Sequence, residues 1–420
     1  MPRPEAARAV ITGLGVVAPN GIGTDKWWNA TKSGQSGIKR ISRFDPSKYA
    51  TRVAGEVEGF EATDYIEQRL VVQTDRWTWM ALAAAQMALE DAKFDPSSHD
   101  PYRMSVITSS SSGGNEFGQK EIQNLWGKGP IFVGAYQSIA WFYAATTGQI
   151  SIKYGMKGPS SVIVSEGAGG LEALWHSRRM IRRGVDFVVS GGTEAPIGPY
   201  ALTCQLTSGR LSNGSDPGAA YRPFDEAAAG YVPGEGGAII TVEHAERARE
   251  RGAPQVYGEI AGYGATNDGD DPRRSDSDGR QLARAITIAL ERAGIGPDGV
   301  DAIFADATGT PEADAAEVDA IRQVFGDRAG QVPVTAPKTM VGRLYGGGAP
   351  LDVAAALLAM RDGVLPPTIN LERPAGDGAS LDFVRDEARE AELRTVLVNA
   401  RGFGGFNSAI VLRRPDSAEA

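Results

Sequence analysis

Short runs of β-branched residues alternate along the chain with longer segments of helical composition, and several of the runs end in glycine clusters. The run at 9–17 (AVITGLGVV) predicts a buried strand, and the segment at 76–93 predicts a helix that is apolar on most faces. Further strands are expected at 104–108, 185–190 and 395–399, each followed by glycines. Because strands that alternate with helices build layered sheets, this pattern predicts an α/β fold.

The two halves of the chain are weakly similar to each other. A strand ends in glycines at 188–192 (VVSGG) and again at 398–405 (VNARGFGG). Two βαβ-type halves, residues 1–250 and 251–420, would explain this similarity, although any α/β chain can repeat such a pattern. A polar loop at 268–279 is expected on the surface, and the tail from residue 414 is expected to be frayed.

Composition excludes several classes of function. The formal net charge of −9 argues against a nucleic-acid partner. The chain has no apolar run near the ~20 residues that span a bilayer, and its N-terminus does not resemble a secretory signal, so a cytoplasmic protein without a membrane partner is expected. A single cysteine, Cys204, excludes internal disulfides, and three histidines leave little for a metal site.

Three segments resemble the β-ketoacyl synthases of the thiolase-fold condensing enzymes. They are 162–173 (VIVSEGAGGLEA), 304–317 (FADATGTPEADAAE) and 338–348 (KTMVGRLYGGG). Three more segments extend the resemblance over nearly the whole chain: 11–20 (ITGLGVVAPN), 222–237 (RPFDEAAAGYVPGEGG) and 402–407 (GFGGFN). The resemblance implies a thiolase-like fold, in which two pseudo-repeated βαβ-type halves form a layered α/β/α/β/α core.

The resemblance also implies that the catalytic residues have been replaced. A condensing enzyme needs a cysteine thiolate for the acyl chain and two histidines for decarboxylation. The cysteine position matches Gly167, and the two histidine positions match Asp306 and Arg343; of the catalytic set only Lys338 is retained. We therefore do not expect this chain to condense acyl groups alone. Asp306 and Arg343 are expected to form an ion pair within a packed, charge-neutral plug.

This pattern of replacement resembles the chain length factor, or ketosynthase β subunit, of type II (aromatic) polyketide synthases. The resemblance implies a heterodimer with a ketosynthase α subunit, acting in polyketide antibiotic biosynthesis. Acyl groups would arrive on the phosphopantetheine of a separate acyl carrier protein, so no cofactor of its own is expected. Many members carry glutamine, with a proposed role in decarboxylation, where this chain has Gly167, and glycine cannot donate the same hydrogen bond.

In that lineage the growing poly-β-keto chain enters a tunnel whose lining sets the product length. The resemblance assigns lining positions to Asn115, Gly118 and Ile122, which lie at helical spacing, and to Tyr200. Glycine at 118 is expected to leave the tunnel open for a product of about decaketide length, where bulkier side chains would stop the chain earlier. The alternative is that Gly118 only permits close helix packing.

Aromatic residues are concentrated at 136–152, which resembles the dimer-contact region of the family. Trp141 and Phe142 are the interface candidates, because aromatic side chains dominate buried contacts between subunits. Cys204 lies far from the catalytic motifs and is expected to be a small core residue.

Three other functions stay open at this point. The chain could be a stand-alone acyl-binding or scaffolding protein of thiolase fold. It could also be the partner subunit of a polyene-type ketosynthase. A hydrolase using Glu166 and Asp306 as paired carboxylates is the third alternative, although no nucleophile or metal-ligand cluster is found near them in the sequence.

Overall fold

A computed structural model describes residues 7–271 and 278–415. The polar loop predicted at 268–279 and the tail predicted to be frayed from residue 414 therefore lie partly outside the described residues. No helix within the described ranges is long and apolar enough to cross a membrane.

The central sheet consists of two half-sheets with the same strand pattern. The first contains, in spatial order, β1 (Ala9–Ala18), β8 (Gly236–His244), β7 (Phe187–Glu194), β5 (Met104–Ser109) and β6 (Ser161–Ile163). The second contains β9 (Gly258–Asn267), β16 (Phe406–Arg413), β15 (Thr395–Gly402), β10 (Ala302–Phe304) and β11 (Pro333–Thr335). In each half the first two pairings are antiparallel and the last two are parallel.

The half-sheets meet where β1 pairs with β9, and two short strands extend them: β2 (Gly21–Ile22) and β13 (Asp382–Phe383). The repeated pattern confirms the predicted pseudo-repeat of βαβ-type halves, and the strands predicted at 9–17, 104–108, 185–190 and 395–399 are β1, β5, β7 and β15. The exact boundary near residue 250 stays a prediction.

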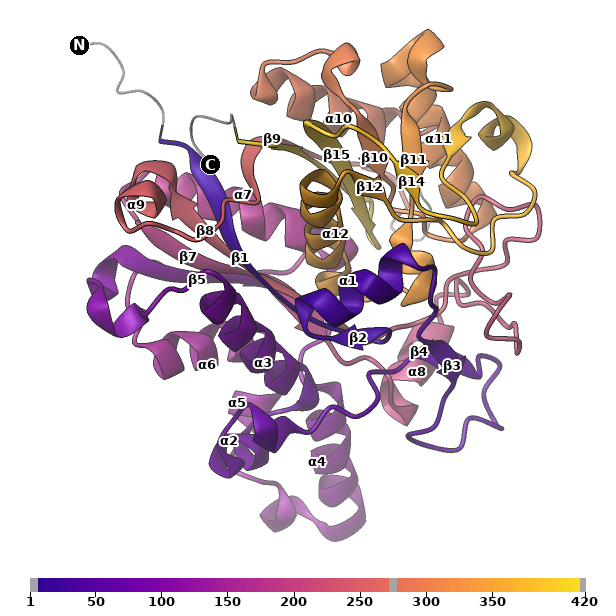
Figure 1. Ribbon diagram of the computed structural model, residues 1–420. Coiled ribbons are helices and arrows are strands. Elements are labelled where there is room, and N and C mark those ends of the chain that lie inside the picture. Colours follow the sequence, from indigo (N-terminus) through magenta and orange to yellow (C-terminus); the bar gives the residue numbers. More distant parts are fainter. Residues whose placement is uncertain (1–6, 272–277, 416–420) are drawn as a thin grey trace.

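Helices form three layers around the half-sheets (Figure 1). Between the half-sheets lie α7 (Gly169–Ile181) and α12 (Gly348–Asp362), which contact each other and strands of both halves. The outer layers contain α3 (Arg76–Asp91) and α6 (Ala145–Tyr154) on one side, and α10 (Arg280–Ala293) and α11 (Pro311–Phe325) on the other. The chain therefore has the α/β/α/β/α arrangement of a thiolase-like fold.

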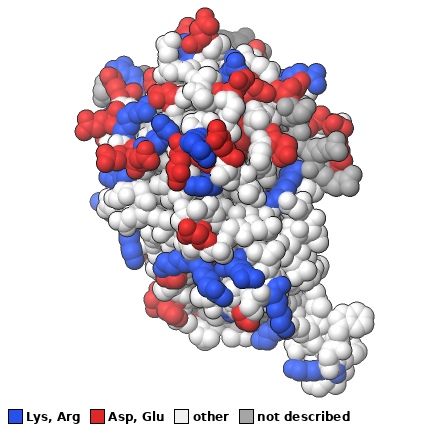
Figure 2. All heavy atoms as spheres, turned by 90° about the vertical axis from the view of Figure 1, so that its right-hand side faces the viewer, with Lys and Arg blue, Asp and Glu red and all other residues white. Residues whose placement is uncertain are grey.

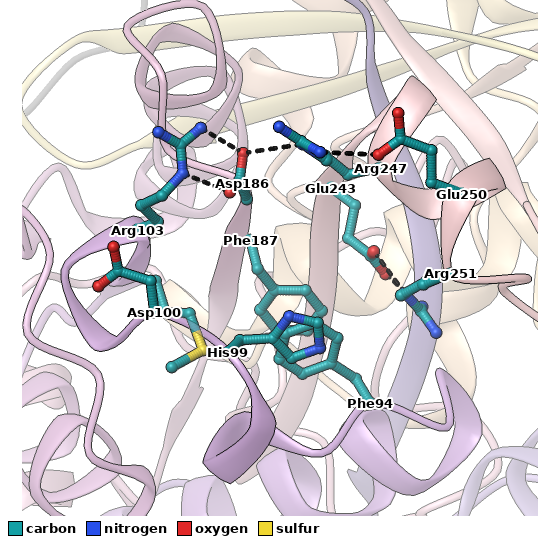
Figure 3. Close-up of a pocket in the computed structure, with 11 residues that line it drawn as sticks. Phe94, His99, Asp100, Arg103, Asp186, Phe187, Glu243, Arg247, Glu250 and Arg251 are labelled. Atoms are coloured by element: carbon teal, nitrogen blue, oxygen red, sulfur yellow. Dashed lines mark hydrogen bonds and ion pairs between the residues drawn. The ribbon is translucent and has the colours of Figure 1, made fainter.

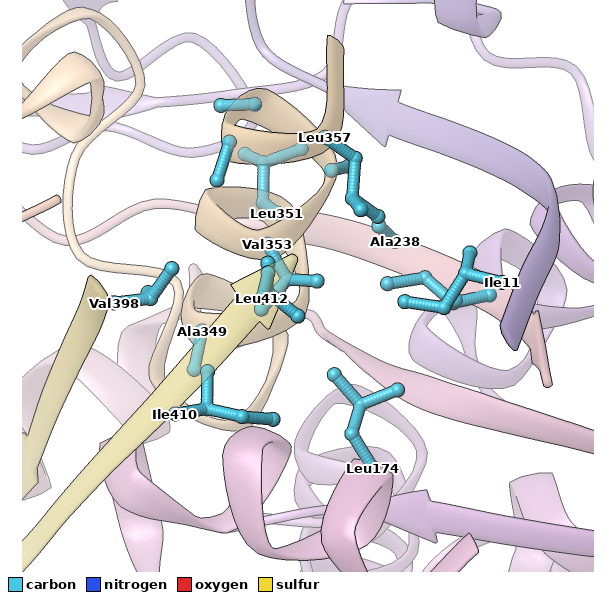
Figure 4. Close-up of a cluster of buried hydrophobic side chains, with 14 of the residues drawn as sticks. Ile11, Leu174, Ala238, Ala349, Leu351, Val353, Leu357, Val398, Ile410 and Leu412 are labelled. Atoms are coloured by element: carbon cyan, nitrogen blue, oxygen red, sulfur yellow. The ribbon is translucent and has the colours of Figure 1, made fainter. Parts of the chain in front are cut away.

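Helix α12 occupies the centre of the largest core cluster (Figure 4). Every residue from Ala349 to Met360 is buried, so the helix has no solvent-facing stripe. Its sequence is rich in alanine and leucine, which suits a helix covered on both sides. Leu351 and Leu357 belong to the same cluster as Ile11 of β1 and Ile410 of β16, so the central helix packs both half-sheets together.

The outer helix α3 approaches β1 unusually closely. A Cβ atom added at Gly15 would lie 1.9 Å from the carbonyl oxygen of Ala84, and one at Gly13 would lie 2.1 Å from that of Ala88. The glycines of the opening strand are therefore needed for helix–strand contact rather than for turn formation.

The remaining elements lie outside the layered core. They are α1 (Thr24–Lys32), β3 (Ile38–Arg40), β4 (Val53–Gly55), α2 (Gln68–Gln73), α4 (Asn115–Lys128), α5 (Gln137–Ala140), α8 (Pro199–Leu206), α9 (Ala245–Glu250), β12 (Val364–Leu365) and β14 (Arg389–Glu390). Helix α4 and the loop that follows it form the lowest part of the molecule in Figure 1, away from the sheet.

Candidate functional site

The three motif segments come together where strands of the two half-sheets end. The 3-10 turn Glu166–Ala168 leads into α7, and Asp306 directly follows β10. The 3-10 turn Pro337–Met340 carries Lys338, and Arg343 follows it ahead of α12. The predicted grouping of Gly167, Asp306, Lys338 and Arg343 is therefore present in the fold.

Arg343 is the centre of this group. Its side chain is buried, and its Nη1 lies 3.5 Å from Asp306 Oδ1 while its Nη2 lies 3.4 Å from Glu166 Oε2. Nη2 also donates to the carbonyl oxygen of Arg401 at 2.5 Å. The predicted Asp306–Arg343 ion pair is thus present, and both carboxylates of the hydrolase alternative are held by the same guanidinium.

Asp306 is ionised despite its burial. Burial alone would raise its pKa, but Arg343, Lys338 and Arg401 together hold the pKa of the carboxyl well below its usual range. Its two oxygens accept hydrogen bonds from the Arg401 N–H at 2.9 Å and from the Thr308 hydroxyl at 2.8 Å. A carboxylate fixed in this way cannot act as a proton donor near neutral pH.

Lys338 binds the loop that carries Asp306. Its Nζ donates to the carbonyl oxygen of Asp306 at 2.8 Å and lies 2.7 Å from Asp352 Oδ2 on α12. The retained lysine therefore holds the backbone of the motif and ties it to the central helix.

Glycine at position 167 has a steric explanation. A Cβ atom added there would lie 2.4 Å from the carbonyl oxygen of Arg401 and 2.8 Å from Arg343 Nη2. Real Cβ atoms essentially never approach other atoms so closely, so the guanidinium and the neighbouring strand occupy the space of a side chain. Gly167 and Arg343 are consequently matched to each other.

A cavity of about 450 Å³ opens beside this ionic cluster. Glu166, Arg343 and Arg401 form part of its wall, and Asn115 lies on another side. The expectation of a packed plug is therefore wrong in one respect. Arg343 is turned back toward Asp306 and Glu166, so the pocket beside it stays open.

Cys204 is not the core residue that we expected. It is exposed on α8 and lines the cavity, together with Ala201 and Gln205 of the same helix. Helix α8 buries Ala201 and Leu202 but leaves Thr203 and Cys204 exposed, so the thiol lies on the side of the helix that faces away from the core. Tyr200, in the first turn of α8, is 45% exposed, and its backbone N–H donates to Gln119 of α4 at 2.9 Å.

Asn115, Gly118 and Ile122 all lie on α4, as their spacing predicted, but in different surroundings. Asn115 lines the cavity, Ile122 is 40% exposed, and Gly118 is buried. A Cβ at Gly118 would lie 3.1 Å from Cδ1 of Trp141. In the isolated chain Gly118 therefore packs against an indole ring, as the alternative interpretation expects, and its role in a tunnel stays a prediction.

Several residues of the site were not identified from the sequence. Arg401 precedes the glycine loop 402–407, and its position just ahead of that motif was the only available signal. Tyr231 and Tyr345 line the cavity with their rings 6.1 Å apart, and Arg210 lies at its rim over Phe403 at 5.1 Å. Tyr231 and Tyr345 lie within the motif segments 222–237 and 338–348, which were a signal for them, whereas Arg210 lies outside every motif segment.

Glu194, at the end of β7, is fully buried and accepts hydrogen bonds from Ser111 and from the Ser112 hydroxyl at 2.7 Å. Burial raises its pKa from the ordinary 4.5 to about 7, although the serine hydrogen bonds oppose this shift. Because the pKa is higher in the folded state, the protonated carboxyl stabilises the folded protein. This stabilisation is fully present below about pH 4.5 and is lost as the pH rises through about 7.

Glu194→Gln is therefore expected to flatten the dependence of the melting temperature on pH between about pH 4.5 and pH 7, because glutamine stays neutral. Thermal unfolding followed by circular dichroism measures this. Glu392→Gln, at an exposed ion pair, is the matched control and should keep the slope of the wild type. A slope in Glu194→Gln equal to that of the wild type would contradict the burial of an ionising carboxyl.

A second cavity, of about 590 Å³, lies at the opposite ends of the strands (Figure 3). Its charged residues already pair with one another: Arg103 with Asp186, and Arg251 with Glu243. Below them, the rings of Phe94 and Phe187 are stacked with centroids 3.6 Å apart. Because the arginines of this cavity are paired with its carboxylates, the cavity has the character of a structural ion-pair network.

Two domain families match the chain in succession. The Beta-ketoacyl synthase N-terminal domain matches residues 6–248, and the Beta-ketoacyl synthase C-terminal domain matches residues 257–372. The chain belongs to the β-ketoacyl synthase family. The resemblance seen in the sequence motifs is therefore confirmed.

Within the β-ketoacyl synthase family, the chain is similar to β subunits of polyketide synthases. It is 54% identical over 409 residues to the tetracenomycin polyketide synthase ketoacyl synthase beta subunit of Streptomyces glaucescens, covering 97% of this chain and 98% of the relative. It is 51% identical to the actinorhodin polyketide putative beta-ketoacyl synthase 2 of Streptomyces coelicolor, covering 96% of this chain and 98% of that one.

Solved structures of this β-ketoacyl synthase family have the same fold. The ishigamide ketosynthase/chain length factor superposes with a TM-score of 0.90 at 29% identity, covering 98% of this chain and all of the other. A second match is a chain from the structure of a type II polyketide synthase acyl-carrier protein in complex with its ketosynthase bound to the hexaketide. It superposes with a TM-score of 0.89 at 30% identity, covering 98% of this chain and all of the other. The predicted chain length factor resemblance is thus confirmed.

Proposed function

We propose that this chain is the non-catalytic chain length factor of a type II polyketide synthase and acts only when paired with a ketosynthase α subunit. The observation that carries the proposal is the pairing of Arg343 with Asp306, the residues at the two assigned histidine positions, and with Glu166 beside Gly167. A guanidinium bonded to two carboxylates offers neither a thiolate to take the acyl chain nor the two imidazoles that condensation needs. The similarity to polyketide synthase β subunits supports the same conclusion.

The surface offers a place for such a partner. Twelve of the seventeen large exposed hydrophobic side chains in the described ranges fall between residues 122 and 164, and we call this group the apolar face. Its members are Ile122, Leu125, Trp126, Ile131, Phe132, Tyr136, Ile139, Trp141, Phe142, Tyr143, Ile152 and Val164. Figure 2 shows that the lowest part of the molecule carries few charged side chains. An apolar surface of this extent favours burial against another chain.

The edge of the sheet supports the same position for the partner. β6 ends the strand order of the first half-sheet, and Val164 directly follows it with 49% of its surface exposed. An open edge strand beside an apolar surface suits pairing with a second chain. We propose that the α subunit, which shares the fold, covers β6 and the apolar face, with Trp141 and Phe142 inside the interface.

We propose that the chain sets the length of the polyketide by the shape of the tunnel. Asn115, Gly118, Ile122 and Tyr200 would line the tunnel beyond the α-subunit thiol, and the growing chain would stop where it meets a wall. Overpacking a closed space costs about 1–3 kcal/mol, which is enough to bias termination.

Gly118→Phe is expected to shorten the product by at least one two-carbon unit, because the new ring competes with the polyketide and with Trp141 for space. The chain would be co-expressed with an α subunit and an acyl carrier protein, and the product masses compared. Gly127→Phe on the same helix, where an added Cβ meets nothing within 4 Å, is the matched control and should leave the masses unchanged. Equal product masses from the two assembled variants would contradict the proposal that residue 118 limits the length of the polyketide.

Acyl groups would reach the complex on the phosphopantetheine of the acyl carrier protein, and we propose that this chain needs no cofactor of its own. The cytoplasmic location and the absence of a nucleic-acid partner stay predictions from the sequence. The second candidate function is that of a stand-alone acyl-binding protein. It is favoured by the cavity of about 450 Å³, which is open in the isolated chain.

A further inference from the structure

Helix α4 begins without a cap of its own. Its N-cap residue is Gly114, and no side chain at that position accepts a hydrogen bond from the first turn. The first N–H groups of a helix have no partner within the helix, and an acceptor at its start stabilises it. Here the acceptor comes from elsewhere in the chain, because Asp75 Oδ2 accepts from the N–H of Phe117 at 2.7 Å.

The same carboxylate caps a second helix. Asp75 is the N-cap of α3, and its Oδ1 accepts from the N–H of Trp77 at 3.3 Å. One side chain therefore links the first turns of α3, which packs on the sheet, and of α4, which carries the residues assigned to the tunnel. Asp75 itself is 2% exposed and is not part of the cavity wall.

The contact between Asp75 and α4 is close and depends on glycine. A Cβ atom added at Gly114 would lie 3.1 Å from Cβ of Asp75 and 2.1 Å from the carbonyl oxygen of Ala140. Any other residue at 114 would push the start of α4 away from its acceptor. The glycine and the aspartate thus form a matched pair that sets where α4 begins.

The two ends of α4 are held differently. At the N-terminal end, Asp75 bonds the helix and Glu194 bonds the preceding Ser111 and Ser112. At the other end, Trp126 is 83% exposed. Further along, Gln119 and the buried Glu121 accept from the N–H groups of Tyr200 and Gly134, so the bonds of Asp75 and Glu194 are those that fix the start of the helix.

We propose that Asp75 is a positioning residue for chain-length control. By fixing the start of α4 against α3, it holds Asn115 and Gly118 at the place in the tunnel wall where they limit the length of the polyketide. Asp75 does not touch the polyketide itself. This inference rests on the proposed function, since it assumes that α4 lines the tunnel.

The test separates the two caps that Asp75 provides. Asp75→Ser keeps a good N-cap for α3, but the shorter side chain does not reach Phe117 as well. In the complex with the α subunit we expect amide hydrogen exchange at 117–119 to rise roughly tenfold, because an opened helix start exchanges faster. We also expect a mixture of product lengths in place of one dominant length.

Asp314→Asn is the matched control. Asp314 is as buried as Asp75 and also accepts two backbone N–H bonds, from Phe224 and Gly309, but it lies far from α4 in the sequence and on α11. If destabilisation alone broadened the products, Asp314→Asn would broaden them too, and that result would overturn the inference. Should Asp75→Ser fail to fold, Asp75→Asn, which keeps the size of the side chain, takes its place.

The remaining outcomes distinguish the inference from the proposed function. If Gly118→Phe shortens the products while the Asp75 variant makes products of wild-type length, the positioning role is overturned and the proposal that residue 118 limits the length of the polyketide stands. If neither variant changes the products of an assembled complex, both are overturned. Broadened products with Asp75→Ser and unchanged ones with Asp314→Asn would establish the positioning role.

Discussion

Arg343→Ala is expected to lower the free energy of unfolding by about 3–5 kcal/mol, the range found when one partner of a buried ion pair is removed. Arg343 is 8% exposed and is bonded to Asp306, Glu166 and the carbonyl oxygen of Arg401. Alanine leaves Glu166 without its cation at the wall of the cavity and leaves Asp306 with only Lys338 and Arg401 as neighbouring cations. Carboxylates that lose their cation in a buried site must be protonated or resolvated, and both cost free energy.

Urea unfolding followed by tryptophan fluorescence measures this effect in the purified protein. Arg394→Ala is the matched control, because Arg394 pairs with Glu392 at the surface, where both side chains are more than three-quarters exposed. Such a pair contributes about 0–1 kcal/mol. Equal unfolding midpoints for the two variants would show that the charged cluster does not support the fold.

Phe142→Asp is expected to weaken the pairing with the α subunit by roughly 100-fold or more, as the loss of an aromatic hot spot commonly does. Phe142 is 60% exposed in the isolated chain, so the substitution removes little packing within the chain itself. In the complex, however, the aspartate would be buried among Trp141, Tyr143 and other apolar side chains, and an unpaired buried charge is strongly unfavourable.

Co-purification and analytical ultracentrifugation measure the loss of the complex. Tyr102→Asp is the control: Tyr102 is a 68% exposed aromatic residue outside the apolar face, and its replacement should leave assembly unchanged. If Phe142→Asp and Tyr102→Asp assemble equally well, the partner binds elsewhere. A Phe142→Asp chain with an unchanged melting temperature would exclude misfolding as the cause of lost assembly.

The backbone architecture could be predicted well from the sequence because it depends on local patterns. The run at 9–17 and the helix-like segment at 76–93 became β1 and α3, and the repeated glycine-ended strands gave two half-sheets with the same strand pattern. The ion pair of Asp306 and Arg343 was also predictable, because the motif fixes both positions and opposite charges in a buried site must meet.

Side-chain directions were less predictable. Cys204 is exposed because α8 turns Ala201 and Leu202 toward the core instead, and this choice of face was not evident from the sequence. The open cavity follows from the side chain of Arg343, which turns toward Glu166 as well as Asp306. Gly118 meets Trp141, which comes from a different segment of the chain, and so the packing of this glycine could not be deduced from helical spacing.

Pairing with a ketosynthase α subunit is tested most simply by the mass of the particle that forms when the wild-type chain is co-expressed with that subunit. We expect one copy of each subunit, because the apolar face and the edge of β6 are left uncovered by the chain itself. Native mass spectrometry gives the composition directly. A stable homodimer of this chain that leaves the α subunit unbound would contradict the proposed heterodimer and favour the stand-alone acyl-binding function.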